Sequence, residues 1–191
     1  MNFLAHVYLS GDNDPLLVGN FIGDFVKGSQ MDIYPEEIQK GIRLHRSIDH
    51  FTDTHEIVLQ SKVRLRDQFR HYAPVIVDVY YDHFLAKNWS TYSAVPLMDY
   101  TTQFYQKIQT YIDILPKGVI HMLNYMSKDN WLYHYQFLEG IQRAFVGMSR
   151  RTKFESKMEQ AVEALKDHYS AFESEFQSFF PLLQKHVSNF E

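Results

Sequence analysis

Three carboxylates lie in segments of the chain that are otherwise apolar. Asp24 is surrounded by phenylalanine, isoleucine and valine in GNFIGDFVKG, and Asp78 and Asp82 lie in APVIVDVYYDHFLAKNW. An ionised carboxylate in such a setting costs free energy unless it is paired or holds a metal ion. Asp78 and Asp82 are four residues apart, so on a helix they share one face and repel each other unless a cation lies nearby. All three are therefore candidate metal ligands.

Histidines supply the second kind of candidate ligand. His45 and Asp49, four residues apart in GIRLHRSIDHFTDTH, would share a helix face, and His6 lies in the first predicted helix. Imidazole and carboxylate ligands from several helices suit manganese, iron or zinc, with magnesium as a further alternative, and a helical bundle can hold such a site in its core. The alternative is structural, with His6 hydrogen-bonded in the core and Asp49 paired with Arg43 or Arg46.

Helices must position these side chains, because apolar residues recur at helical spacing along nearly the whole chain and no segment shows the period of a strand. One helix is predicted over 56–70, and the next begins at Pro74 and runs to about Trp89. A stripe from Phe154 to Phe179 predicts a single C-terminal helix that Pro181 stops or kinks. Further stripes cover 97–115 and 131–145. We therefore expect an all-α fold, a compact bundle of seven or eight helices forming one domain over residues 1–191.

Composition and charge restrict the function classes. A chain of 191 residues fits one domain with a single core. Its net charge of -4 argues against a general nucleic-acid binder, and the absence of cysteine excludes disulfides, zinc–thiolate sites and cysteine nucleophiles. There is no signal peptide and no apolar run of the roughly 20 residues that a membrane span needs. We expect a cytoplasmic protein with no membrane partner; the sequence carries no indication of its oligomeric state.

Two basic clusters are each compatible with a solvated face or with a docking surface for an acidic partner. The first cluster consists of Lys62, Arg64, Arg66 and Arg70. The second consists of Arg143, Arg150, Arg151 and Lys153. Spacing alone does not distinguish the two roles.

Four motifs, in chain order, resemble the acyl carrier protein phosphodiesterase family. They are MNFLAHVYLS, GNFIGDFVKG, GIRLHRSIDHFTDTH and VDVYYDHFLAKNW, and LNYMSKDNWLYHY also resembles the second half of that family. The resemblance implies an all-helical fold distantly related to the HD-domain metal phosphohydrolases. It also implies hydrolysis of the phosphodiester that joins 4'-phosphopantetheine to a serine of holo acyl carrier protein, with manganese as the expected ion.

The resemblance also assigns roles to individual residues. His6 matches the histidine of the NFLAH motif, Asp24 the acid of the GDF motif, and His45 with Asp49 the HR-x-x-D positions; Asp82 and His83 match the DHF positions. We expect Asp24, His45 and Asp82, together with His6 or Asp78, to hold the ion, and Asp49 to orient His45 or to act as a fifth ligand.

Three further residues are expected to act on the phosphodiester. Lys27 and Arg46, or Arg43 in place of either, would neutralise charge on the phosphoryl oxygens. His83 would protonate the departing serine oxygen; helix packing is its alternative role. HD enzymes are named for an adjacent His–Asp pair, whereas this chain has the reversed order at Asp49–His50 and Asp82–His83, so their ligand set does not transfer one for one.

Acyl carrier proteins are acidic, so the basic face from Lys62 to Arg70 is the expected docking surface. Two alternatives stay open. One is an HD-like phosphohydrolase that acts on a nucleotide or another small phosphoester. The other is a non-catalytic helical binding protein in which the buried acids are structural.

Overall fold

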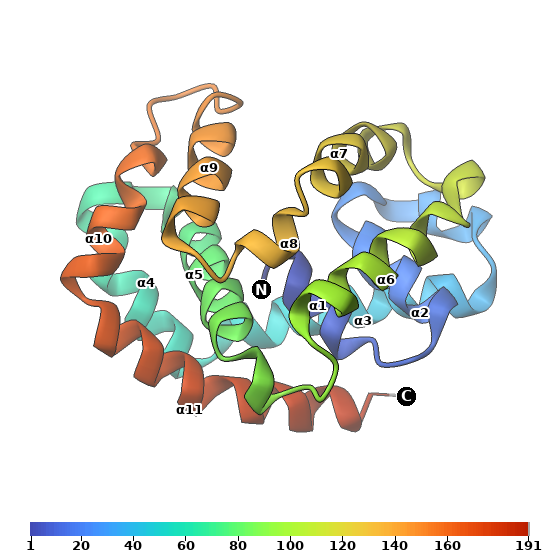
Figure 1. Ribbon diagram of the computed structural model, residues 1–191, viewed down its shortest axis with the longest axis horizontal. Helices are drawn as coiled ribbons and strands as arrows, with labels where there is room; N and C mark the ends of the chain where they lie inside the picture. The colour runs from blue at the N-terminus through green and yellow to red at the C-terminus, as the bar shows by residue number, and fades with distance from the viewer. Residues whose placement is uncertain (191) are drawn as a thin grey trace.

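The computed structural model describes residues 1–190, and all regular structure within them is helical (Figure 1). This confirms the predicted all-α fold, but these residues form eleven α-helices rather than seven or eight. In chain order the α-helices are α1 (Phe3–Leu9), α2 (Asp14–Ile22), α3 (Glu36–Thr54), α4 (Glu56–Phe69), α5 (Ala73–Lys87), α6 (Leu97–Gln109), α7 (Lys117–Lys128), α8 (Trp131–His134), α9 (Leu138–Ser149), α10 (Ala161–Asp167) and α11 (Tyr169–Ser188).

The predicted C-terminal helix is divided in the structure. α10 ends at Asp167 and α11 begins at Tyr169, because His168 has backbone angles of φ -131° and ψ 26°, outside the helical region. Pro181 does not end α11, which continues to Ser188. Phe180 and Leu183 are fully buried on either side of the proline, so packing against the core outweighs the hydrogen bond that proline removes.

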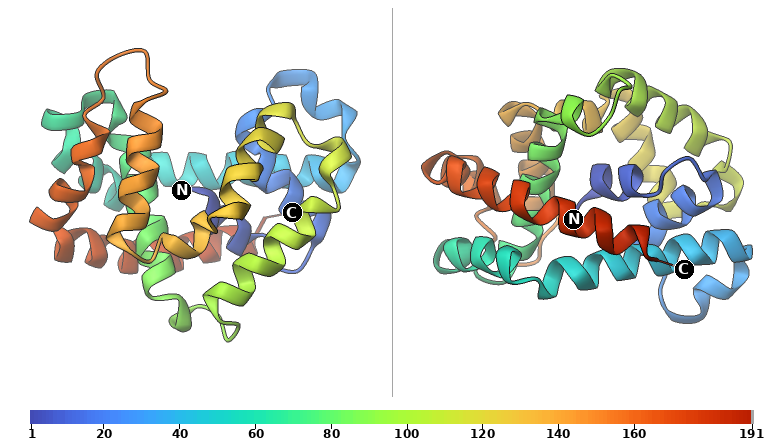
Figure 2. Two further views of the ribbon diagram at one scale, coloured as in Figure 1. Left: turned by 45° about the horizontal axis from the view of Figure 1, so that its top comes forward. Right: turned by 90° about the horizontal axis from the view of Figure 1, so that it is seen from below.

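The segment from Trp131 to Phe145 is divided in the same way. The short helix α8 ends at His134, and α9 begins at Leu138 after a turn. The left view of Figure 2 shows α7 and α9 on opposite sides of α8. The chain therefore changes direction between two helices that the sequence pattern merged into one.

The helices share one hydrophobic core with α5 at its centre. Tyr80, Tyr81 and Phe84 on α5 are fully buried, and α5 packs against α1, α4, α9 and α11. The long helix α11 also packs against α3 and α4 (Figure 2). None of the helices in residues 1–190 is long and apolar enough to cross a lipid bilayer.

α2 and α3 approach each other so closely that only glycine fits at the contact. A Cβ atom on Gly19 would lie 2.0 Å from the carbonyl oxygen of Ile38, and one on Gly41 would lie 2.2 Å from that of Leu16. Both neighbours are backbone atoms, which cannot move aside without shifting a helix. The close contact holds Asn20 of α2 beside His45 of α3, and both residues belong to the site described next.

Candidate active site

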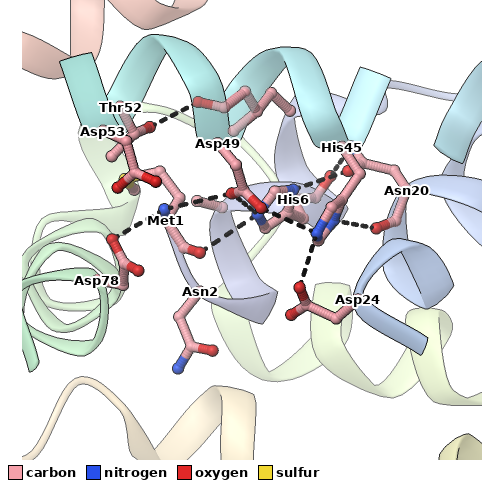
Figure 3. Close-up of polar contacts among 12 residues, drawn as sticks. Met1, Asn2, His6, Asn20, Asp24, His45, Asp49, Thr52, Asp53 and Asp78 are labelled. Carbon is pink, nitrogen blue, oxygen red and sulfur yellow. Dashed lines mark hydrogen bonds and ion pairs between the residues drawn. The ribbon is translucent and has the colours of Figure 1, made fainter. Parts of the chain in front are cut away.

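α3 carries two adjoining polar side chains on one face. His45 and Asp49 are one turn apart, and the Nε2 atom of His45 lies 3.0 Å from Oδ2 of Asp49. A short 3-10 turn, η1 (Gly23–Phe25), follows α2 and brings Oδ1 of Asp24 to 3.2 Å from the same nitrogen (Figure 3). His45 is buried, whereas Asp24 is exposed. One imidazole nitrogen therefore faces two carboxylates at the edge of the protein interior.

α1 adds a second histidine to this group. The rings of His6 and His45 are stacked with their centroids 4.1 Å apart, and Nε2 of His6 lies 3.2 Å from Oδ1 of Asp49. One ligand atom from each of His6, His45 and Asp49 lies within 4.8 Å of the others. We call these three residues, together with Asp24, the His–Asp cluster. Side chains from α1, α3 and η1 thus converge with a spacing that a single metal ion can bridge.

Asn20 holds both histidines in the tautomer that a metal ligand needs. Its side-chain nitrogen donates to the carbonyl oxygen of His6 at 2.8 Å and to Oγ of Ser10 at 2.9 Å, which orients the side-chain oxygen toward His6. That oxygen accepts from Nδ1 of His6 at 2.7 Å, and the backbone oxygen of Asn20 accepts from Nδ1 of His45 at 2.8 Å. With the proton on Nδ1, Nε2 of the neutral ring presents its lone pair.

The Nε2 atom of His6 faces two oxygen acceptors, Oδ1 of Asp49 at 3.2 Å and the carbonyl oxygen of Met1 at 3.2 Å. Burial lowers the pKa of His6 and so opposes a second proton on the ring. A cation bound between Nε2 and these oxygens would satisfy all three atoms, so the residues present fit a divalent metal ion.

Both carboxylates of the His–Asp cluster are ionised at neutral pH. The hydrogen bond with His45 lowers the pKa of Asp24. Burial favours the neutral form of Asp49, but hydrogen bonds with His45 and His6 outweigh it and lower its pKa. Burial likewise opposes the charge on His45, yet Asp24 and Asp49 raise its pKa to about 9. A proton on His45 therefore compensates the carboxylates where a metal ion would otherwise do so.

Asp78 and Asp82 have different partners although they lie one turn apart on α5. The amino group of Met1 lies 3.0 Å from Oδ1 of Asp78 and 3.8 Å from Oδ1 of Asp49, which joins Asp78 to the edge of the cluster. Asp82 is fully buried and accepts from three backbone N–H groups at the start of α1. The donors are those of Asn2, Leu4 and Ala5, at 3.3, 2.7 and 3.2 Å.

A cavity of about 420 Å³ adjoins the cluster. Asp24 and Phe25 of η1 line it on one side, and Asn2 lines it close to the start of α1. The wall is completed by one face of α9, Val75 of α5, Met122 of α7, Asp129 and Trp131 of α8. The cavity therefore extends from Asp24 of the cluster to α7, α8 and α9.

Comparison with known proteins assigns the whole chain to one family. The family model described as "Acyl carrier protein phosphodiesterase" matches residues 1–183. Curated proteins with that name are 33% identical to the chain in Escherichia coli O6:H1, 33% in Enterobacter sp. strain 638 and 34% in Klebsiella pneumoniae strain 342. These alignments cover 98–99% of this chain and 98% of each relative. The chain belongs to the acyl carrier protein phosphodiesterase family. No solved structure matches it significantly, so the relation to HD-domain enzymes stays a prediction.

Six metal ligands were predicted from the sequence of this member of the acyl carrier protein phosphodiesterase family, and four of them lie together in the structure. They are His6, Asp24, His45 and Asp49. Asp78 lies at the edge of the cluster, and the ligand role predicted for Asp82 does not agree with its position as the acceptor for α1. Two acids on one face of α5 coexist because one pairs with an amino group and the other accepts backbone N–H groups.

The residues predicted to act on the phosphodiester are more widely separated. The guanidinium group of Arg46 donates to the carbonyl oxygen of Val26 at 3.2 Å, next to η1, and Lys27 is exposed on the same stretch of chain. His83 lies outside the cluster. Its Nδ1 atom donates to the carbonyl oxygen of Tyr135 at 2.7 Å, and its Nε2 atom accepts from the hydroxyl group of Tyr169 at 2.7 Å. Both ring nitrogens are thus occupied, which agrees with the packing alternative for His83.

Asn20 contacts both histidines of the cluster, and we did not single it out from the sequence. The available signal was an amide between buried apolar residues of α2, the same reasoning that selected Asp24. We expect Asn20→Ala to weaken manganese binding about 10- to 100-fold, as observed for residues that orient metal ligands. Titration of the folded variant with manganese would measure this. An unchanged affinity would mean that His6 keeps its orientation without the amide.

Proposed function

We propose that this family member is a divalent-metal-dependent phosphodiesterase that removes 4'-phosphopantetheine from holo acyl carrier protein. The observation that carries the proposal is the convergence of ligand atoms from His6, His45 and Asp49 within 4.8 Å of one another, beside Asp24. Its second support is membership of a family whose curated members are named for this activity. In the reaction, water attacks phosphorus, the bond from phosphorus to the serine oxygen breaks, and that oxygen takes up a proton.

His6, His45 and Asp49 would hold the ion, with Asp24 as the fourth candidate ligand. When bound, the ion supplies Lewis-acid activation of the phosphoryl group and of water. Two imidazole nitrogens in the donor set favour iron or zinc over magnesium, and the carboxylates suit manganese as well. We keep manganese as the proposed ion because it is the one that the family resemblance implies.

The remaining steps fall to side chains around the ion. Asp24 is the most exposed carboxylate of the cluster and lines the cavity, so we assign it as the group that accepts a proton from the attacking water. Lys27 and Arg46 flank η1, and we assign them to offset the negative charge that develops on the phosphoryl oxygens. Asn20 keeps both imidazoles in the binding tautomer throughout.

Intact-mass analysis of holo acyl carrier protein after incubation with the purified protein and manganese tests this proposal. We expect conversion to the apo form, no conversion in excess chelator, and recovery when manganese is restored. A folded, metal-loaded protein that leaves the carrier protein intact but hydrolyses a member of a nucleotide panel would establish the small-phosphoester alternative. A protein that binds no metal and converts nothing would support the binding-protein alternative.

We also propose that the carrier protein docks on the basic face of α4. Lys62 pairs with Asp53 at 2.7 Å and Arg64 with Glu175 at 2.7 Å, whereas Arg66 and Arg70 form no ion pair within residues 1–190. The double variant Arg66→Glu/Arg70→Glu should raise KM for the carrier protein at low salt by about tenfold, because like charges across an interface oppose encounter. Hydrolysis of bis(p-nitrophenyl) phosphate should be unaffected.

The single variant Arg66→Glu should show part of the same effect, and Lys185→Glu on the exposed side of α11 is its matched control, because it makes the same change from a positive to a negative charge at another exposed position. An equal loss of activity toward the carrier protein and toward the small phosphodiester would count against docking at α4. An equal rise in KM for the carrier protein in the control variant would count against it as well.

A further inference from the structure

Building on the proposed function, we propose that the cavity between η1, α8 and α9 binds the pantetheine portion of the substrate, with the phosphodiester at the His–Asp cluster. Asp24 belongs to both the cluster and the cavity wall. Asn2, which also lines the cavity, donates through its side-chain nitrogen to the hydroxyl group of Tyr135 at 3.3 Å. Figure 3 shows Asn2 and Asp24 extending to the same side of the cluster.

The chemistry of the wall matches a pantetheine chain. Phe3, Phe25 and Trp131 are aromatic lining residues, and Met122 and Met148 are flexible apolar ones. Such a wall suits the dimethyl group and methylenes of pantetheine. The cavity volume of about 420 Å³ lies within the roughly 300–1,000 Å³ typical of small-molecule sites, which combine an apolar lining with a few polar groups.

The wall also carries polar side chains, those of Asn2, Asp24, Asp129, His134, Tyr135, Arg143 and Arg151. Asn2 and Tyr135 form one hydrogen-bonded pair, and the exposed side chains of Arg143 on α9 and of Arg151 just beyond it line the cavity. Amide and guanidinium groups can donate to the two amide carbonyls of pantetheine. Asn2 also offers an oxygen that can accept from an amide N–H.

Two glycines on the cavity face of α9 have different roles. A Cβ atom on Gly140 would lie 1.9 Å from the carbonyl oxygen of His134, so packing against α8 requires that glycine. A Cβ atom on Gly147 would meet nothing within 4 Å. Glycine inside a helix lowers its stability, and no packing contact compensates here. The space at Gly147 is open to the cavity, where the substrate arm would occupy it.

The variant Gly147→Leu places a side chain in the cavity without displacing any neighbouring atom at its Cβ. We expect it to lower kcat/KM for holo acyl carrier protein more than tenfold, with manganese affinity, which depends on the His–Asp cluster, unchanged. Gly147→Ala should retain most activity and raise the melting temperature. Arg150→Leu, directly after the end of α9 and outside the cavity wall, is the control and should behave as the wild type.

A binding measurement separates this inference from the proposed function. Trp131 lines the cavity and Trp89, the other tryptophan of the chain, is buried elsewhere, so 4'-phosphopantetheine should change the fluorescence of Trp131 saturably. The chain has no cysteine with which the thiol could react. The affinity should fall at least tenfold in Gly147→Leu and stay unchanged in Arg150→Leu.

The outcomes of the two measurements are distinct. Wild-type protein that binds 4'-phosphopantetheine but converts no carrier protein would refute the proposed reaction and leave the cavity assignment standing. Equal rates of carrier-protein conversion by the wild type and by Gly147→Leu would overturn the cavity assignment. So would the absence of a saturable fluorescence change in the wild type. Binding of a nucleotide in place of 4'-phosphopantetheine would overturn it as well.

Discussion

Replacing Asp49 by alanine is expected to abolish measurable manganese binding and to slow hydrolysis of holo acyl carrier protein about a thousandfold. Within residues 1–190, Asp49 is the one residue whose side-chain oxygens face the Nε2 atoms of both histidines, His6 at 3.2 Å and His45 at 3.0 Å. A catalytic metal ion contributes several kcal/mol of transition-state stabilisation, and each 1.36 kcal/mol corresponds to a factor of ten in rate. Steady-state kinetics together with manganese titration would measure both effects.

Asp53→Ala is the control for the Asp49 variant, because Asp53 lies one turn further along α3. It is exposed and pairs with Lys62 at 2.7 Å, outside the cluster. It should retain wild-type metal affinity and rate. Full activity in a folded Asp49→Ala protein would show that Asp49 is not a metal ligand. It would thereby contradict the proposed metal centre.

Replacing Asp82 by alanine is expected to lower the free energy of unfolding by about 1–3 kcal/mol for each buried backbone donor that loses its acceptor. The carboxylate accepts from the backbone N–H groups of Asn2, Leu4 and Ala5, and those of Leu4 and Ala5 are buried. The first turn of a helix has no intrahelical acceptor for these groups. Denaturant titration of the variant against the wild type would measure the loss.

Asp82→Asn distinguishes an acceptor for α1 from a metal ligand. It keeps one side-chain oxygen, so as an acceptor it should lose only part of the stability, and the folded fraction should still bind manganese. Near-wild-type stability combined with lost metal binding would instead make Asp82 a ligand, as we predicted from the sequence.

The core of the cluster could be predicted because its residues carry local signals. His45 and Asp49 are four apart on a helix with a clear apolar stripe, so their shared face follows from helical geometry. Asp24 was conspicuous as an acid between apolar residues. That His6 on α1 stacks on His45 could not be predicted from spacing, because it depends on how α1, α2 and α3 pack.

The role of Asp82 could not be predicted because its partners are backbone N–H groups about 80 residues away. Any sequence presents such groups, so no residue pattern marks them. The position of His83 depends likewise on Tyr135 and Tyr169, which approach it only in the folded chain. Burial of both side chains was predictable, whereas the choice between metal ligand and hydrogen-bond acceptor required the packed structure.

The helix count differed for a similar reason. The stripe from Phe154 to Phe179 has helical spacing throughout, yet the chain leaves the helix at His168. The spacing of apolar residues indicates which residues face the core. Two successive helices on the same side of the core can show the same spacing as one continuous helix. Pro181 is the opposite case, since a local helix-breaking signal is overridden by the burial of Phe180 and Leu183.

Equilibrium dialysis of chelator-treated protein against manganese, followed by metal analysis, tests the central claim most directly. We predict saturable binding by the wild-type protein, a rise in melting temperature on binding, and loss of both in Asp49→Ala. A folded wild-type protein that binds no manganese, iron, zinc or magnesium and whose stability ignores them would contradict the claim that the His–Asp cluster is a metal centre.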